Sequence, residues 1–194
     1  MDLGLQERVA IVGGGSRGIG RATAAALLRE GARVTICARG AEILERTAQD
    51  LAATADPERV FAVAADLSQP DDVSRVVART RERWGRVDVA VNNLGGPPIG
   101  TPLQMTDAQW LGAVEQSFLS VVRMCREVVP LMQERGWGRI VNVLSLTVRQ
   151  PELTLALSTS ARLAAIGYTK SLADEVAAGG IRALRPGLGL GQRL

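Results

Sequence analysis

The sequence predicts an α/β fold, in which a parallel, doubly wound sheet has helices on both faces. Short apolar runs typical of buried strands alternate with helical runs along the chain, and a glycine-rich loop joins the first run to the first helix. The 194 residues suit one domain with a substantial core, and the 46% hydrophobic content excludes general disorder. We therefore expect a single domain over residues 1–187, followed by a tail at 188–194.

The opening unit of the chain predicts a nucleotide-binding βαβ motif. An apolar strand at 8–13 leads into the loop at 14–20, a helix follows at 21–30, Gly31 ends it, and a second strand runs over 33–38. Glycines let the backbone approach a ligand, and the helix start directs N–H groups and a partial positive charge toward it. A phosphate cradle is thus expected, the alternative being a purely structural turn.

The remaining elements continue the alternation. We expect strands at 60–64, 87–91, 139–144 and 181–184, and helices near 41–53 and at 70–84, 107–132 and 157–178. Ligands of such sheets bind at the carboxyl ends of the strands, near the point where the strand order reverses. Binding residues should therefore directly follow strands.

The end of the second strand favours NADP(H) over NAD(H). An NAD site has an acidic residue near this point to bind the ribose 2′-hydroxyl. Ala38 cannot do so, whereas Arg39, helped by Arg17 of the glycine loop, can pair with a 2′-phosphate. The alternative is a pair of solvated surface arginines.

Polar residues also follow the third and fourth strands. Asp66, next to Leu67, could accept a hydrogen bond from an adenine amino group, or could serve equally as a turn or N-cap residue. Asn92-Asn93-Leu94-Gly95 lies after the fourth strand, where it could border a cofactor or form a turn without a ligand.

Several classes of function are excluded by what the sequence lacks. The chain has no histidine, so a histidine general base, triad or metal site cannot exist. Cys37 and Cys125 are far apart, and no metal-ligand spacing occurs, so we expect no metal and two buried free thiols rather than a disulfide.

The charge pattern and the hydropathy indicate which kinds of partner the protein binds and where in the cell we expect it. The net charge is +3 with both signs interspersed, and no basic stripe with interleaved aromatic residues points to nucleic acid. No apolar run is long enough to span a membrane, and the N-terminus lacks the layout of a signal peptide. We expect a cytoplasmic protein with a small-molecule substrate.

Five motifs together resemble the short-chain dehydrogenase/reductase family, closest to its 3-oxoacyl-[acyl-carrier-protein] reductase-like members. They are Gly14/Gly18/Gly20 in the form G-x-x-x-G-x-G, Asp66-Leu67, Asn92–Gly95, the strand at 138–143, and Lys170-Ser171-Leu172-Ala173. The resemblance implies a Rossmann-like, dinucleotide-binding domain and a homodimer or homotetramer. It also implies NADP(H)-dependent interconversion of carbonyls and alcohols, including reduction of 3-oxoacyl thioesters. The implied cofactor contacts are Gly14, Ser16, Arg17, Gly18, Ile19, Gly20, Arg39, Asp66, Leu67, Asn93 and Gly95.

The catalytic positions depart from the family pattern. The family uses a tyrosine as proton donor, a lysine that lowers its pKa, a serine that holds the substrate oxygen, and an asparagine that supports a water. Ser145 matches the serine, whereas Ser158 stands at the tyrosine position, Arg162 at the lysine position and Ser117 at the asparagine position. Tyr168 and Lys170 are two residues apart and do not share a helix face, so they cannot replace that pair.

The residues present still allow a slower reaction. Ser158 and Arg162 are four residues apart and share a helix face. Arg162 could hold ribose hydroxyls and stabilise a developing alkoxide, while Ser145 and Ser158 orient a carbonyl and water supplies the proton. A serine hydroxyl is a far weaker acid than a phenol, and arginine stays charged. The alternative is an ordinary helix-start serine and a solvated helical arginine.

The family resemblance ends after Arg185-Pro186-Gly187. We therefore expect the chain to lack the family's last strand and lid segment, as a truncated or frame-shifted relative would. Two functions follow: an NADP(H)-dependent oxidoreductase, or a catalytically weak nucleotide-binding relative that acts as a sensor or oligomer partner. A third, weaker interpretation is a nucleotide-sugar or lyase-like relative that uses its cofactor without net turnover.

Overall fold

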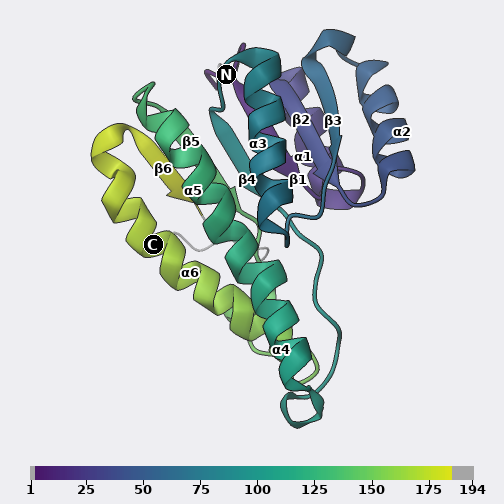
Figure 1. Cartoon of the computed structure of the whole chain (residues 1–194), viewed down its shortest axis with the longest axis vertical. Helices are drawn as coiled ribbons and strands as arrows, with labels where there is room; N and C mark the ends of the chain where they lie inside the picture. Colours follow the sequence, from purple (N-terminus) through teal and green to yellow (C-terminus); the bar gives the residue numbers. More distant parts are fainter. Residues whose placement is uncertain (1–2, 185–194) are drawn as a thin grey trace.

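The computed structural model describes residues 3–184, which contain one six-stranded sheet (Figure 1). The strand order is β3-β2-β1-β4-β5-β6, and all five neighbouring pairs are parallel. The strands are β1 (Val9–Gly13), β2 (Arg33–Ala38), β3 (Val60–Ala64), β4 (Val89–Asn92), β5 (Gly138–Asn142) and β6 (Ile181–Leu184). The predicted parallel sheet is confirmed, while the predicted tail at 188–194 and the Pro-Gly at 186–187 lie outside the described residues.

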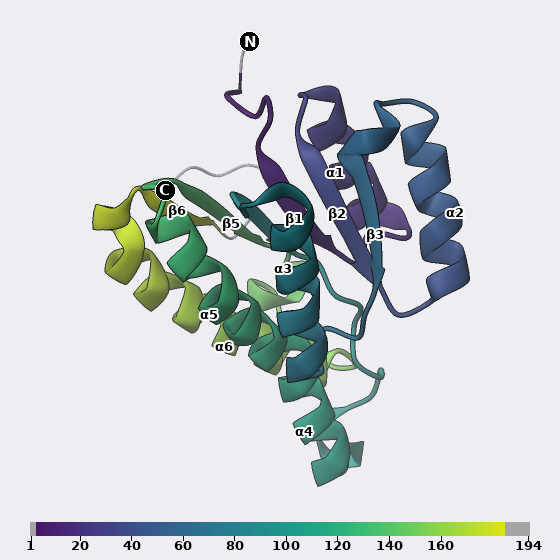
Figure 2. The same ribbon diagram turned by 45° about the horizontal axis from the view of Figure 1, so that its top comes forward.

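Helices cover the sheet from both sides (Figure 2). On one face lie α1 (Gly18–Arg29) and α2 (Ala41–Ala52), and on the other α3 (Pro70–Trp84), α5 (Ser120–Gln133) and α6 (Ala156–Val176). Each face has its own apolar core, since strand side chains alternate between the two faces. The helices thus fix the sheet, and with it the loops at the ends of the strands.

The chain changes direction between β1 and β4. It runs outward from β1 through β2 to β3, then crosses back and places β4 beside β1, with Val12 opposite Val91. The loops after β1 and β4 therefore leave the sheet in different directions. This reversal opens the crevice in which such sheets hold ligands.

The helix expected at 107–132 is interrupted. It consists of α4 (Asp107–Val114), a π-helical turn (Glu115–Leu119, η3) and α5. The N–H group of Ser120 donates to the carbonyl of Glu115, and the hydroxyl of Ser120 donates to the carbonyl of Gln116 at 2.6 Å. The side chain thereby occupies the carbonyl that a regular helix would use, which the apolar pattern alone does not reveal.

Short 3-10 turns complete the described chain, at Pro57–Arg59, Pro102–Gln104, Leu146–Val148 and Ala177–Gly179. Helix α3 ends at Gly85, which has the left-handed φ of 73° that glycine adopts without strain.

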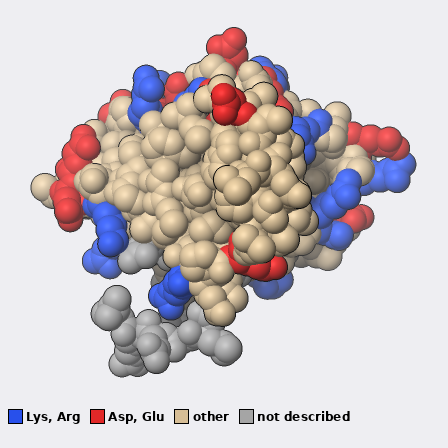
Figure 3. Space-filling view, turned by 90° about the horizontal axis from the view of Figure 1, so that it is seen from below, with Lys and Arg blue, Asp and Glu red and all other residues tan. Residues whose placement is uncertain are grey.

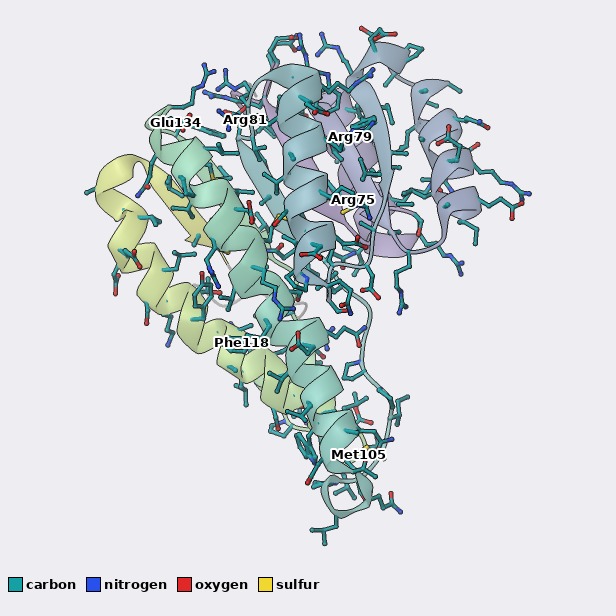
Figure 4. All side chains as sticks on the ribbon, in the orientation of Figure 1. Arg75, Arg79, Arg81, Met105, Phe118 and Glu134 are labelled. Carbon is teal, nitrogen blue, oxygen red and sulfur yellow. The ribbon has the colours of Figure 1, made fainter. Side chains whose placement is uncertain are left out.

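Arg75, Arg79 and Arg81 project from α3 (Figure 4). No helix of the described residues is long and apolar enough to cross the bilayer.

Candidate active site

A cavity of about 810 Å³ lies at the carboxyl ends of β1, β2, β3 and β4. Its volume is within the range of small-molecule and cofactor sites. The sequence-predicted residues that line it are Gly14, Ser16, Arg17, Ile19, Arg39, Asp66, Leu67, Asn93 and Gly95. Four separate strand ends thus contribute to one site.

Gly18 and Gly20 do not line this cavity. They lie in the first turn of α1, which begins earlier than the predicted helix at 21–30, and they shape the loop before it. A Cβ atom on Gly20 would lie 2.2 Å from the carbonyl oxygen of Gly14, and one on Gly14 would lie 2.4 Å from that of Asn93. Gly14 and Gly18 also have left-handed φ angles of 60° and 50°. Side chains at these positions would therefore clash or strain the loop. Asn93 holds the loop to β4, because its Nδ2 donates to the carbonyl of Gly13 at 3.2 Å.

The glycine loop presents unpaired positive charge to the cavity. Helix α1 begins after Arg17 without a side-chain cap, so no side chain competes for its first N–H groups. Arg17 and Arg39 are exposed and form no ion pair within residues 3–184. Both remain available to an anionic ligand.

Asp66 has a structural role in the described chain. Its Oδ1 accepts hydrogen bonds from the backbone N–H of Ser68 at 3.0 Å and from the Ser68 hydroxyl at 2.8 Å. The N–H of Asp66 donates to Asp72, and this bond together with Arg75 holds the pKa of Asp72 below its usual value. Asp66 is thus a turn residue that also lines the cavity, and its contact with adenine stays a prediction.

The remaining cavity wall comes from residues that were not among the predicted cofactor contacts. Gly112, Glu115 and Gln116 belong to α4 and the π-helical turn, and Gln116 Nε2 donates to the carbonyl of Gly95 at 3.0 Å. Cys37, Ala38, Gly40, Ile43, Ala65, Ser68, Gln69 and Leu94 complete the lining. Gly112, Glu115, Gln116 and Ile43 reach the cavity through helix packing, whereas the other residues lie at or just after the ends of β2, β3 and β4.

A buried polar ladder joins β4 and β5 to helix α6. Asn92 Nδ2 donates to Asn142 Oδ1 at 2.7 Å, and Asn142 Nδ2 donates to the Thr169 hydroxyl at 2.8 Å. The Thr169 hydroxyl donates in turn to the carbonyl of Ala165 at 2.6 Å. All three side chains are buried. The ladder sets the position of α6, which carries Ser158 and Arg162.

Ser158 and Arg162 lie together, as their spacing predicts. Arg162 Nη1 donates to the Ser158 hydroxyl, and Nη2 donates to the carbonyl of Leu94 at 3.5 Å. Burial lowers the pKa of Arg162, although a guanidinium stays charged at neutral pH. Arg162 is therefore partly buried and not a freely solvated helical arginine.

Ser117 faces the same place from the π-helical turn. Its side chain is 5% exposed, and its hydroxyl has no hydrogen-bond partner within residues 3–184. Ser117 and Arg162 both line a cavity of about 10 Å³, together with Asn92, Leu94, Val121, Val143 and Leu144. This volume is about that of one water.

Ser145 is held by its own loop. Its hydroxyl accepts hydrogen bonds from the Thr147 N–H at 3.3 Å and the Thr147 hydroxyl at 3.0 Å, and within residues 3–184 it forms no hydrogen bond with Ser158 or Arg162. Tyr168 is only partly exposed and packs edge-on against Phe118, which is labelled in Figure 4, at 6.3 Å between ring centroids. Burial raises the pKa of Tyr168. Neither Tyr168 nor Lys170 lines either cavity.

The end of the molecule at which α4 projects is poor in charge. Figure 3 views this end, and its charged side chains lie mainly around the rim. Exposed apolar side chains belong to α4 and the neighbouring loops, among them Ile99, Leu103, Leu111 and Leu153. No group of three potential metal-ligating side chains occurs in the described part of the chain.

The family model described as short chain dehydrogenase matches residues 8–189. The chain belongs to the short-chain dehydrogenase family. A Streptomyces coelicolor relative named as a ketoacyl reductase is 38% identical over 180 residues, covering 89% of this chain and 66% of its own. The 3-oxoacyl-[acyl-carrier-protein] reductase of Escherichia coli is 30% identical over 183 residues, covering 92% of this chain and 71% of its own. The chain thus spans about two thirds of the length of such relatives.

Solved structures of the family share this fold. L-sorbose reductase from Gluconobacter frateurii, complexed with NADPH and L-sorbose, has a TM-score of 0.92 and 33% identity, covering 95% of this chain and 70% of its own. Actinorhodin polyketide ketoreductase with NADPH has a TM-score of 0.87 and 36% identity, covering 92% and 69%. The Rossmann-like sheet and the likeness to 3-oxoacyl reductases are confirmed.

Proposed function

We propose that this chain is an NADP(H)-dependent oxidoreductase that interconverts carbonyls and alcohols. The cavity at the ends of β1–β4 carries the proposal, because the glycine loop, Arg17, Arg39 and Asn93 all line it. The NADPH complexes of L-sorbose reductase and the polyketide ketoreductase support the cofactor. The relatives named for 3-oxoacyl reduction support a 3-oxoacyl thioester as one candidate substrate.

The residues present fit a dinucleotide with a 2′-phosphate. The uncapped start of α1 suits a pyrophosphate, and Gly14 and Gly20 allow the close packing that forms the loop. Arg17 and Arg39 supply planar, permanently charged groups for a phosphate. The cavity has no acidic side chain directly after β2, where an NAD site requires one.

The side chains of α6 would act on the substrate oxygen. Bound nicotinamide supplies or accepts a hydride. Ser158 accepts a hydrogen bond from Arg162, so its own hydroxyl is polarised to donate to a carbonyl oxygen. Ser145 uses its lone pairs for Thr147, which leaves its hydroxyl proton for the same oxygen. Water supplies the proton that a phenol would give, and Arg162 stabilises the developing alkoxide.

The cofactor preference is tested by titrating the protein with NADPH and NADH. Arg39→Ala should weaken NADPH by about tenfold, as expected for one charge-assisted contact, and should leave NADH nearly unchanged. Arg149→Ala is the matched control, because Arg149 is exposed, forms no ion pair within the described residues and lies outside the cavity. Equal losses for both nicotinamides would contradict the 2′-phosphate assignment.

The second candidate is a nucleotide-binding protein with little or no turnover. The observation that favours it is Ser158 at the tyrosine position, since general acid catalysis typically contributes about 10²–10⁴-fold. NADPH oxidation with a panel of ketones and 3-oxoacyl thioesters separates the two functions. Tight NADPH binding with no consumption of any substrate would establish the silent relative and exclude the oxidoreductase.

A further inference from the structure

The loop after β4 is held by side chains rather than by its own backbone. Residues 94–99 have no regular secondary structure and form no backbone–backbone hydrogen bond within the described chain. The carbonyl of Leu94 accepts a hydrogen bond from Arg162 at 3.5 Å. The carbonyl of Gly95 accepts one from Gln116 Nε2 at 3.0 Å, and only this second distance is usual for an N–H···O bond. Gln116 therefore supplies the main hydrogen bond to this loop.

The segment that Gln116 holds is part of the wall of the large cavity. Leu94, Gly95 and Gln116 all line the cavity of about 810 Å³ that the glycine loop also lines. A Cβ atom on Gly95 would lie 3.5 Å from Gln116 Nε2, so the amide lies directly against the loop. An irregular loop populates several conformations unless something holds it, and a ligand that must order the loop binds more weakly. The attachment by Gln116 should therefore increase the affinity of this cavity for its ligand.

The π-helical turn fixes the backbone from which the Gln116 side chain extends. The carbonyl of Gln116 accepts a hydrogen bond from the hydroxyl of Ser120 at 2.6 Å. The preceding residue, Glu115, pairs with Arg123 at 2.6 Å. Arg123 also donates to the carbonyl of Ser68 at 2.6 Å, in the segment after β3. The turn is thus attached to the segment after β3 through Arg123 and to the loop after β4 through Gln116.

We propose that Gln116 is a positioning residue for the dinucleotide: its amide holds the Gly95 carbonyl and keeps the loop after β4 in the binding conformation before the ligand arrives. The inference rests on the proposed function, which assigns a dinucleotide to this cavity. Gln116 acts through the loop, so its contribution does not depend on the 2′-phosphate. It should support NADPH and NADH equally, whereas Arg39 should support NADPH alone.

The test replaces the amide by Gln116→Met, which has a similar length and no N–H donor. Fluorescence titration should show that NADPH and NADH are both weakened, each by about three- to tenfold, the range for one neutral hydrogen bond. In the absence of nucleotide, thermolysin should cleave the variant faster than the wild type within residues 94–99, as mass spectrometry of the fragments measures. Gln116→Lys keeps a donor of similar reach and should restore the slower cleavage.

Gln49→Met is the matched control, because Gln49 is an exposed helical glutamine outside the cavity and its side chain forms no hydrogen bond within residues 3–184. This variant should leave both nucleotide affinities and the cleavage rate unchanged. If Gln116→Met keeps the wild-type affinities, the loop attachment does not serve binding and the proposal is wrong.

Two further outcomes separate this proposal from its alternatives. If Gln116→Met weakens the nucleotides without faster cleavage at 94–99, Gln116 contacts the ligand itself and the positioning role is wrong. If the wild type binds neither NADPH nor NADH, the proposed function fails. Faster cleavage of Gln116→Met would then still show that this side chain holds the loop.

Discussion

Thr169 shows how a single side chain can hold the site in place. It receives the last bond of the ladder from Asn92 through Asn142, and thereby joins the ends of β4 and β5 to α6. The sequence predicts Asn92 directly after the fourth strand and Asn142 within the fifth. It does not indicate Thr169, because that contact depends on the way α6 crosses the sheet.

Thr169→Val tests the ladder. The substitution keeps the shape of the side chain but leaves the buried Asn142 amide without its acceptor, which should cost about 1–3 kcal/mol of unfolding free energy in urea titration. Ser171→Ala is the control: Ser171 is exposed with one long bond of 3.4 Å, so its change should stay within about 0.5 kcal/mol. Equal effects would mean that the ladder contributes no net stability.

The candidate site was predictable from sequence only in part. Residues such as Gly14, Arg39 and Asn93 directly follow strands, and a parallel sheet gathers all such positions at one edge. Gly112 and Gln116 come instead from a helix that folds back over this edge, and no local pattern marks that contact. The partial burial of Arg162 was likewise not evident, since helical spacing fixes the face it shares with Ser158 and not what covers it.

Among the elements, the regular ones follow their sequence patterns closely. The bounds of β2, β3, α3 and β6 agree with prediction, because apolar periodicity, Pro70 and Gly85 mark them. The exception is the segment from Asp107 to Gln133, where a side chain takes over a backbone acceptor. A hydrophobic pattern indicates which face of a helix is buried, but it does not indicate such a hydrogen bond.

Substituting one glycine at the end of α3 and one inside α6 should change the unfolding free energy in opposite directions. Gly85 ends α3 at a left-handed φ, and a Cβ atom added there would have no atom within 4 Å, so Gly85→Ala should cost about 1–2 kcal/mol from backbone strain alone. Gly167 lies inside α6 with equally open surroundings, and Gly167→Ala should stabilise by about 1 kcal/mol. Thermal unfolding of both variants checks this, and destabilisation by Gly167→Ala would contradict it.

At the scale of the whole molecule, we expect the unfolding free energy to fall at alkaline pH and to change little around neutral pH. The chain has no histidine, the group that normally titrates between pH 6 and 8. Cys37 and Cys125 are buried free thiols, and burial raises the pKa of each to about 12. Unfolding returns them to a pKa of about 8.5, so above that pH the unfolded state loses protons first.

The unfolding free energy should therefore be level from pH 6 to 8 and fall above about pH 8.5, by roughly 1 kcal/mol per thiol at pH 9.5. Urea titrations across this range measure it. Replacing Cys37 and Cys125 by alanine lowers stability at every pH but should remove most of the slope between pH 8 and 9.5. An unchanged slope in that variant would assign the decline to other groups. A separate prediction is a homodimer or homotetramer, and light scattering of the protein in solution measures which mass it has.

Inserting or deleting a residue in the π-helical turn should have a different effect on this molecule from the same change in a regular helix. A turn closed over five residues holds one residue more than a regular turn would. Deleting one residue there would join α4 and α5 into one continuous α-helix. It would also rotate α4 relative to α5 by about 100°. Gly112 and Glu115 would then leave the cavity wall, while the strands and their cores stayed as they are. Insertions and deletions at this turn would thus reshape the binding site without altering the sheet that supports it.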